Sequence, residues 1–353
     1  MPPGDDNRLE VRAVRTRPRY AILKRVAVLG VTAVGLYVVW PNLAKVFSAG
    51  PMLATVSPLW GFPLVAAEAA SFVCMWALLR LALDVEPWFP IATAQLAGNA
   101  FSRIVPGGAP AGGALQFDML NTAGIAPARA ATSVTAVSLI STATLLGLPV
   151  ISIVAILITG ASVEHNLFRV GSIAVVVCLV ASAGGALLLF ADRPLLWLGG
   201  LTQRARNRML RRRAPLEDLP ERLVDERDLI RRVLGAGWWK ALLYSAGNWL
   251  LDLTALLIAL AAVGAQPRAS VVLLAYVVAA FLGMIPITPG GLGFVEAGLI
   301  GTLGLAGIGA DQAVLATLVY RLASYWLPMP TGAAAYLLHA RRYGRERGGP
   351  AGG

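Results

Sequence analysis

Residues 285–298 read IPITPGGLGFVEAG, with two prolines, four glycines and a glutamate inside a long apolar run. Proline removes a helical hydrogen bond and glycine weakens a helix, so this stretch predicts a break in the backbone. In hydrocarbon, such irregular backbone is tolerated only where protein or a water-filled cavity surrounds it. The stretch therefore predicts an interrupted segment buried inside a membrane protein.

The composition of the whole chain indicates the same environment. The 353 residues are 57% hydrophobic and only 14% charged, against about 25% charged in ordinary soluble domains. Several apolar runs approach or exceed the roughly 20 residues that cross a bilayer. The net charge of +11 is concentrated between these runs, which is typical of membrane topology rather than of nucleic-acid binding. We predict an all-α polytopic membrane protein and no nucleic-acid partner.

Apolar runs and polar blocks divide the chain. We expect about six spanning helices, at about 26–47, 59–83, 132–159, 169–190, 238–263 and 312–338. Two further apolar regions, 89–123 and 270–308, are broken in the middle. The expected order is a cytoplasmic segment, a first membrane half, a basic cytoplasmic loop, a second membrane half and a cytoplasmic tail, at 1–25, 26–190, 191–237, 238–338 and 339–353.

Arginine and lysine residues set the expected orientation. Residues 1–25 carry seven basic residues, 191–237 eleven and 339–353 four, whereas 48–58 and 160–168 carry none. The positive-inside rule places the two termini in the cytoplasm, in keeping with a bacterial inner-membrane protein. Region 89–123 then enters and leaves from the cytoplasm, and 270–308 from outside. Because each half of 89–123 has only about 15 residues, a re-entrant hairpin is favoured over two full crossings.

Part of the basic loop 191–237 has a helical pattern. From Pro220 to Leu234, apolar residues recur on one face, and Gly235 follows as a stop signal. The pattern predicts an amphipathic helix on the cytoplasmic membrane surface, or else a solvated linker.

The two broken regions resemble each other. Pro106-Gly107-Gly108 is followed by Gly124-Ile125, and Pro289-Gly290-Gly291 is followed at the same distance by Gly307-Ile308. One constant offset along the chain therefore relates position 106 to 289 and position 124 to 307. Because the topology places one hairpin on each side, we predict an inverted repeat of two oppositely oriented re-entrant hairpins, as in many transporters.

Ionisable side chains inside the membrane are costly and are therefore candidates for function. Glu296 lies about one turn into the second half-helix, and Arg321 lies in the last helix. They form either a structural ion pair or a functional pair, in which Arg321 holds an anionic headgroup or Glu296 carries a proton. Arg103 precedes the first tip and either contacts phosphate or extends to the cytoplasm. Asp118 is its expected partner.

Other polar residues extend this candidate site. Glu68 and Asp252 lie within spanning helices, as a proton relay or as buried structural partners. Asn248, one turn before Asp252, suits a polar lining. Asn99 is expected to bond between helices or to touch substrate. The tip glycines allow a headgroup to approach the backbone closely; they are Gly107, Gly108, Gly290 and Gly291.

Three segments carry a resemblance to a known family. NAFSRIVPGGAPAGGALQFDMLNTAGI (99–125), PITPGGLGFVEAGLIGTLGLAGI (286–308) and LVYRLASYWLPMPTGAAAYLL (318–338) resemble signatures of the lysylphosphatidylglycerol synthase transmembrane-region, or flippase-like, family. Ala109-Pro110 departs from it, since a further glycine is more usual there. The residues that match signature positions are Pro106, Gly107, Gly108, Pro289, Gly290, Gly291, Gly293, Glu296 and Arg321.

The resemblance implies re-entrant hairpins and lipid translocation. Because 339–353 is a short polar tail, we expect no aminoacyl transfer, and we expect no cofactor or metal site. The leading hypothesis is a transporter that moves an anionic lipid, a phospholipid or a polyprenyl-phosphate carrier, between leaflets. The alternatives are a polyprenyl-diphosphate phosphatase and a non-transporting partner of an envelope glycosyltransferase. A homo-oligomer or an envelope-biosynthesis partner is left open.

Overall fold

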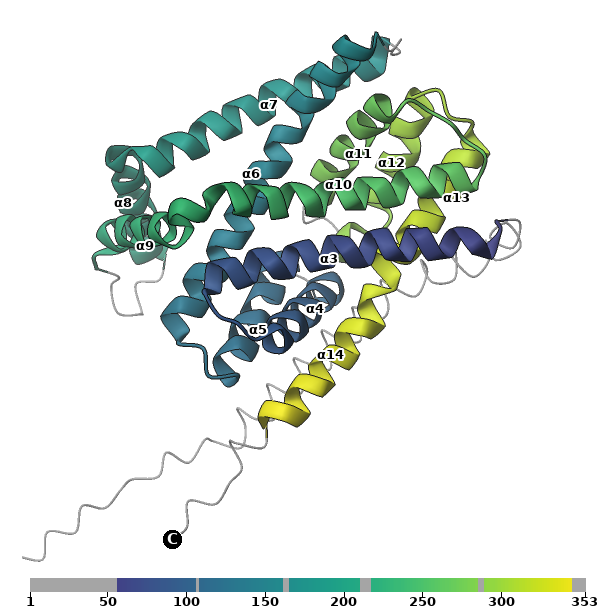
Figure 1. Ribbon diagram of the computed structural model, residues 1–353. Coiled ribbons are helices and arrows are strands. Elements are labelled where there is room, and N and C mark those ends of the chain that lie inside the picture. Colours follow the sequence, from purple (N-terminus) through teal and green to yellow (C-terminus); the bar gives the residue numbers. More distant parts are fainter. Residues whose placement is uncertain (1–55, 106–107, 161–164, 210–216, 285–288, 345–353) are drawn as a thin grey trace, which may run out of the picture.

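The structure is a computed structural model that describes residues 56–105, 108–160, 165–209, 217–284 and 289–344 (Figure 1). Throughout these ranges the chain is helical and contains no strand, which confirms the all-α class. The helix expected at 26–47 and the first tip residues Pro106 and Gly107 lie outside the described residues.

Twelve helices and four short turns follow one another along the described chain. The helices are α3 (Gly61–Leu83), α4 (Trp88–Ile104), α5 (Gly108–Thr122), α6 (Pro127–Thr159), α7 (His165–Phe190), α8 (Asp192–Met209), α9 (Leu219–Leu234), α10 (Trp238–Ala262), α11 (Ala269–Met284), α12 (Phe294–Leu305), α13 (Ala310–Arg321) and α14 (Pro328–Tyr343). The turns are η1 (Pro58–Trp60), η2 (Gly235–Gly237), η3 (Pro289–Gly291) and the π-helical η4 (Leu322–Trp326).

Three segments of the described chain are long and apolar enough to cross a membrane, namely Pro58–Leu83, Pro127–Thr159 and Trp238–Ala262. They correspond to three of the six expected spans. The expected span 169–190 lies within α7. The expected span 312–338 is interrupted, because the π-helical turn η4 separates α13 from α14.

The basic loop 191–237 forms a pair of helices. The expected amphipathic helix is α9, and it ends at Gly235 as predicted. Helix α8 before it was not predicted. Arg227 of α9 bonds Asp192 at the start of α8 at 2.6 Å, so an ion pair joins the two helices.

Each broken region contains two helices, α4 and α5 in the first and α11 and α12 in the second. Helices α4 and α5 cross closely at Gly98 and Gly112, where a β-carbon on Gly98 would lie 2.8 Å from the Gly112 carbonyl oxygen. At 1.5 Å per residue, the 17 residues of α4 extend about 25 Å and the 12 of α12 about 18 Å. Both are shorter than the hydrocarbon core of about 30 Å.

The offset between the two repeat motifs recurs in the backbone geometry. Gly124 and Gly307 end α5 and α12 with φ of 87° and 85°. The amide of the next residue donates back across the turn in each case, from Ile125 to Leu120 and from Ile308 to Leu303. These are the bonds of a glycine-terminated helix end. The following helices, α6 and α13, begin at positions 127 and 310, which the same offset relates.

Equivalent helices of the two halves run in opposite directions. Helices α3 and α10 lie side by side and antiparallel (Figure 1), because Ser71 meets Asn248 while Leu81 lies beside Gly237. The pairing is also exchanged between halves: α14 packs on α4, and α6 packs on α11. This exchange is the packing expected if a pseudo-twofold axis relates the halves.

Candidate functional site

A cavity of about 320 Å³ lies where the two halves meet. Residues of α4, α10, α11, η3, α12, α13 and η4 line it. Its polar lining residues are Arg103, Asp252, Tyr276, Tyr320, Arg321 and Tyr325. Four of the predicted site residues, Arg103, Asp252, Gly290 and Arg321, are therefore brought together here from distant parts of the chain.

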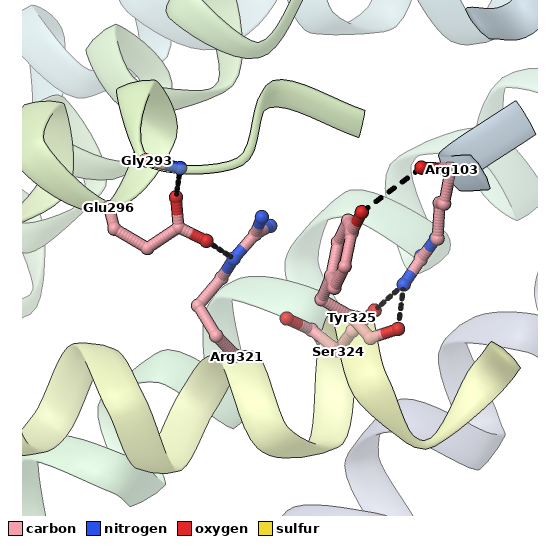
Figure 2. Close-up of polar contacts among 6 residues, drawn as sticks. All are labelled: Arg103, Gly293, Glu296, Arg321, Ser324 and Tyr325. Atoms are coloured by element: carbon pink, nitrogen blue, oxygen red, sulfur yellow. Dashed lines mark hydrogen bonds and ion pairs between the residues drawn. The ribbon is translucent and has the colours of Figure 1, made fainter. Parts of the chain in front are cut away.

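The ring of Tyr325 stands between the guanidinium groups of Arg103 and Arg321 (Figure 2). The guanidinium carbons lie 4.9 Å and 4.3 Å from the ring centroid, within the range of a cation–π contact. The Tyr325 hydroxyl also donates to the Arg103 carbonyl oxygen at 3.2 Å. The aromatic ring thus holds two cations close to each other at one cavity.

Arg103 is fixed by main-chain carbonyls of η4 rather than by an acid. Its Nη1 donates to the carbonyl oxygens of Ser324 and Tyr325, both at 2.6 Å. In a regular helix the Ser324 carbonyl would accept from residue 328, and in a π-helix the Tyr325 carbonyl would accept from residue 330. Both residues are prolines and carry no N–H. Among positions 328–330, only the Met329 N–H could therefore compete with Arg103 for these two carbonyls.

Glu296 uses both carboxylate oxygens within the protein (Figure 2). One oxygen accepts from Arg321 Nε at 2.7 Å, and the other accepts from the Gly293 amide at the start of α12, also at 2.7 Å. The predicted Glu296–Arg321 pair is present, and its side chains are 20% and 11% exposed. Arg321 Nη2 is buried and has no hydrogen-bond partner among the described residues.

The tip glycines differ in their surroundings. Gly290 lines the cavity with φ of 61°, and its close neighbour is Tyr325. At Gly290, the absent β-carbon makes room for the Tyr325 side chain, and whether a headgroup approaches this glycine stays a prediction. Gly291 packs beside Val295, and Gly108 begins α5 with open space around it. Gly107 lies outside the described residues.

Two tyrosines hold the carboxylate of Asp252. The hydroxyls of Tyr276 and Tyr320 both donate to Oδ2 of Asp252, the latter at 2.8 Å. Glu68 of α3 lies beside Asp252 and is 5% exposed. The two acids are therefore neighbours across the α3–α10 contact.

The remaining predicted residues lie away from the cavity lining. Asn248 donates to the hydroxyl and carbonyl of Ser71, so it joins α10 to α3. The Oδ1 of Asn99 is buried without a partner among the described residues. Asp118 is exposed on α5. It is not the partner of Arg103, because the carbonyls of η4 take that place.

The tyrosines of the cavity were not predicted from the sequence. Tyr320 and Tyr325 flank Arg321 in YRLASYW, and Tyr276 is isolated in the apolar run VVLLAYVVAA. A tyrosine hydroxyl within an otherwise apolar run needs a buried hydrogen-bond partner, so the sequence could have indicated that Tyr276 bonds a polar group inside the protein. The prolines of LPMP, which free the acceptors of Arg103, could not be interpreted without the position of Arg103.

These features define a helical membrane protein with a polar cavity between two related halves. The chain belongs to the family of the lysylphosphatidylglycerol synthase TM region, whose sequence profile matches residues 25–332. The resemblance noted from the motifs is thereby confirmed, and the chain is a multi-pass membrane protein.

Two proteins of Methanothermobacter thermautotrophicus, each named UPF0104 membrane protein, are similar to parts of this chain. One is 38% identical over 116 residues, which cover 33% of this chain and 31% of the relative. The other is 33% identical over 87 residues, 25% of this chain and 26% of the relative. The matched parts thus span about a third or less of either relative.

Proposed function

We propose that the protein translocates an anionic lipid between the leaflets of a bacterial inner membrane. The observation that carries the proposal is the pair of cations at the cavity, Arg103 and Arg321, with Nη2 of Arg321 unpartnered among the described residues. A buried donor without a partner is unfavourable. A phosphate or carboxylate oxygen that enters the cavity would satisfy this donor with a charge-assisted hydrogen bond.

Glu296 fits this proposal as a positioning residue. Its two oxygens hold Arg321 and the start of α12, so the carboxylate orients the guanidinium and does not itself need to meet the cargo. Nη2 of Arg321, which lines the cavity, remains without a partner among the described residues. A cavity of about 320 Å³ lies at the small end of ligand sites. It would hold a headgroup while the hydrocarbon chains remain in the bilayer.

The helix pairs support movement through the centre of the membrane. Helices α4, α5, α11 and α12 are too short to cross the hydrocarbon core upright, and Arg103 near the end of α4 and Gly290 before α12 line the cavity. We infer that both pairs are re-entrant hairpins, one from each side, with both chain termini in the cytoplasm. In transporters built as inverted repeats, alternate access arises when one repeat moves against the other around a central site.

Reconstituted liposomes provide the test. Purified protein is placed in vesicles that contain a fluorescent phosphatidylglycerol, and dithionite reports the label in the outer leaflet. We expect the wild type to move the label between leaflets and Arg321→Gln to move it at least about tenfold more slowly, a loss of about 1.4 kcal/mol. Arg129→Gln is the matched control, because Arg129 is exposed at the start of α6. Equal rates for wild type, Arg321→Gln and protein-free vesicles would disprove the proposal.

A further inference from the structure

Glu68 is a buried acid that the proposed function does not yet use. Its side chain is 5% exposed, and Oε1 is buried with no hydrogen-bond partner among the described residues. Glu68 and Asp252 each lie one turn further along the antiparallel α3–α10 pair from the bonded residues Ser71 and Asn248, so the two acids are neighbours, and Asp252 lines the cavity. An unpaired buried carboxylate oxygen is costly in a protein interior, so the arrangement indicates that a cation binds to this pair.

The groups around the pair come from several elements. Besides α3 and α10, which carry the acids, they are supplied by α4, α11, α12, α13 and η4. The charged or titratable groups that face the pair or the adjoining cavity are Arg103, Tyr276, Glu296, Tyr320, Arg321 and Tyr325. The tyrosine hydroxyls occupy Oδ2 of Asp252. Two neighbouring carboxyl groups in a protein interior cannot both ionise without a large cost, so the pair holds a proton on one of them.

The charges near the cavity balance when the pair holds one proton. Arg103 and Arg321 contribute two positive charges, and Glu296 contributes one negative charge. Glu68 and Asp252, which share one proton, together contribute the second negative charge. An anionic headgroup would add a further negative charge in a region where uncompensated charge is expensive. A second proton on the carboxyl pair would restore neutrality.

We propose that Glu68 and Asp252 form a proton-binding site that couples one proton to the passage of one anionic headgroup. The inference rests on the proposed function and adds that a proton gradient supplies the energy for translocation. Because headgroup and proton occupy one cavity at the same time, they move in the same direction. The pair of acids lies on the central α3–α10 contact, where the two halves of the repeat must move against each other.

The test measures a distribution between leaflets at equilibrium. Vesicles with fluorescent phosphatidylglycerol carry a gradient of one pH unit, with the membrane potential clamped by potassium and valinomycin. One pH unit is a tenfold difference in proton activity, equal to about 1.4 kcal/mol. For one proton per lipid, the wild type should therefore accumulate the label about tenfold in the leaflet that faces the alkaline side. Nigericin, which collapses the gradient, should return the ratio to one.

Two variants test whether Glu68 and Asp252 form the proton-binding site. The double variant Glu68→Gln/Asp252→Asn keeps the shapes of both side chains and imitates the fully protonated pair. It should still move the label but reach equal amounts in both leaflets. Asp118→Asn removes an exposed carboxylate of α5 and should keep the tenfold ratio. If the double variant cannot be purified as a single species, the wild-type ratio alone decides whether a proton is coupled.

The outcomes separate this inference from the function on which it rests. Equal leaflets for the wild type under a maintained pH gradient would overturn proton coupling, yet the observed movement would uphold translocation. An asymmetry driven by a sodium gradient at equal pH would replace the proton by sodium and overturn the inference. A tenfold ratio retained by the double variant would move the proton site elsewhere. No movement of label by the wild type would overturn translocation, and proton coupling with it.

Discussion

The Tyr325 hydroxyl fills the space where a β-carbon on Gly290 would stand, since the two atoms would be only 2.5 Å apart. This relation joins the tip of the second hairpin to the ring between the two arginines. Gly290 also has φ of 61°, a conformation that costs other residues about 1–2 kcal/mol.

Replacing Gly290 therefore tests the packing of the tip. We expect Gly290→Ala to lower the melting temperature in detergent, with the backbone cost and the clash together exceeding about 2 kcal/mol. Gly301→Ala in α12 is the control, because open space surrounds that position and alanine favours a helix by up to about 1 kcal/mol. Equal melting temperatures for the two variants would contradict the geometry at Gly290.

The crossing of α4 and α5 offers a second pair of glycines. A β-carbon on Gly112 would lie 2.8 Å from Ser102 Cβ, whereas one on Gly113 would lie 3.8 Å from Val134 Cγ1. Gly112→Ala should destabilise the protein by about 1–3 kcal/mol, the usual cost of overpacking. Gly113→Ala should be neutral or stabilising. Thermal unfolding monitored by tryptophan fluorescence measures both, and an equal loss in both would show that the helices do not cross at Gly112.

A double-mutant cycle separates the two roles of the Glu296–Arg321 pair. Glu296→Gln leaves the Arg321 cation uncompensated, and we expect a loss of about 1.5–3 kcal/mol in stability. Adding Arg321→Gln should recover much of this stability, because no charge then remains unpaired. Lipid movement should not recover, since the headgroup would lose its cation. Recovery of both stability and movement would make the pair purely structural.

Pro328 controls the acceptors of Arg103. Pro328→Ala supplies an N–H that can bond the Ser324 carbonyl. Arg103 should then lose one of its two hydrogen bonds, worth about 1.5 kcal/mol, while the new helical bond offsets this loss in overall stability. We expect lipid movement to slow by about tenfold while the melting temperature is kept or raised. Pro127→Ala, at the first turn of α6, is the control and should leave the rate unchanged. An unchanged rate for Pro328→Ala would mean that the Ser324 carbonyl does not position Arg103.

Cysteine labelling tests the re-entrant hairpin. In a background without Cys74 and Cys178, a cysteine at Glu86 or Ala126 should react from the cytoplasm with an impermeant maleimide. Ala109→Cys, beside the first tip, should resist the reagent added from outside, because a re-entrant tip stops inside the membrane. Rapid labelling of this position from outside would show that α4 and α5 are two full crossings.

Features that are local in the sequence were predictable. Periodicity and length identified α3, α6, α7, α9 and α10, and the recurrence of Gly124-Ile125 at Gly307-Ile308 revealed the repeat. The break in each hairpin followed from proline and glycine chemistry. The Glu296–Arg321 pair followed from the cost of charges in hydrocarbon. In each of these cases the deciding residues lie within a few turns of each other or repeat at one spacing.

Features that depend on side-chain geometry were not predictable. Asp118 was the acid expected to pair with Arg103, yet the main-chain carbonyls of Ser324 and Tyr325 accept hydrogen bonds from that arginine instead. The π-helical turn at 322–326 cannot be read from periodicity, because π and α patterns of that length coincide. The tyrosines of the cavity act through partners that are distant in the sequence, such as Asp252, and only the fold brings them together.

The exchanged packing of the halves has a consequence for biosynthesis. Helix α4 is synthesised long before α14, the helix that covers it, and α14 is the last described helix of the chain. Until α14 is inserted, the first hairpin lacks a large part of its protein surroundings. Contacts so distant in sequence form late in folding. A chain truncated before α14 should therefore fail to fold in both halves, although its first half has been synthesised completely.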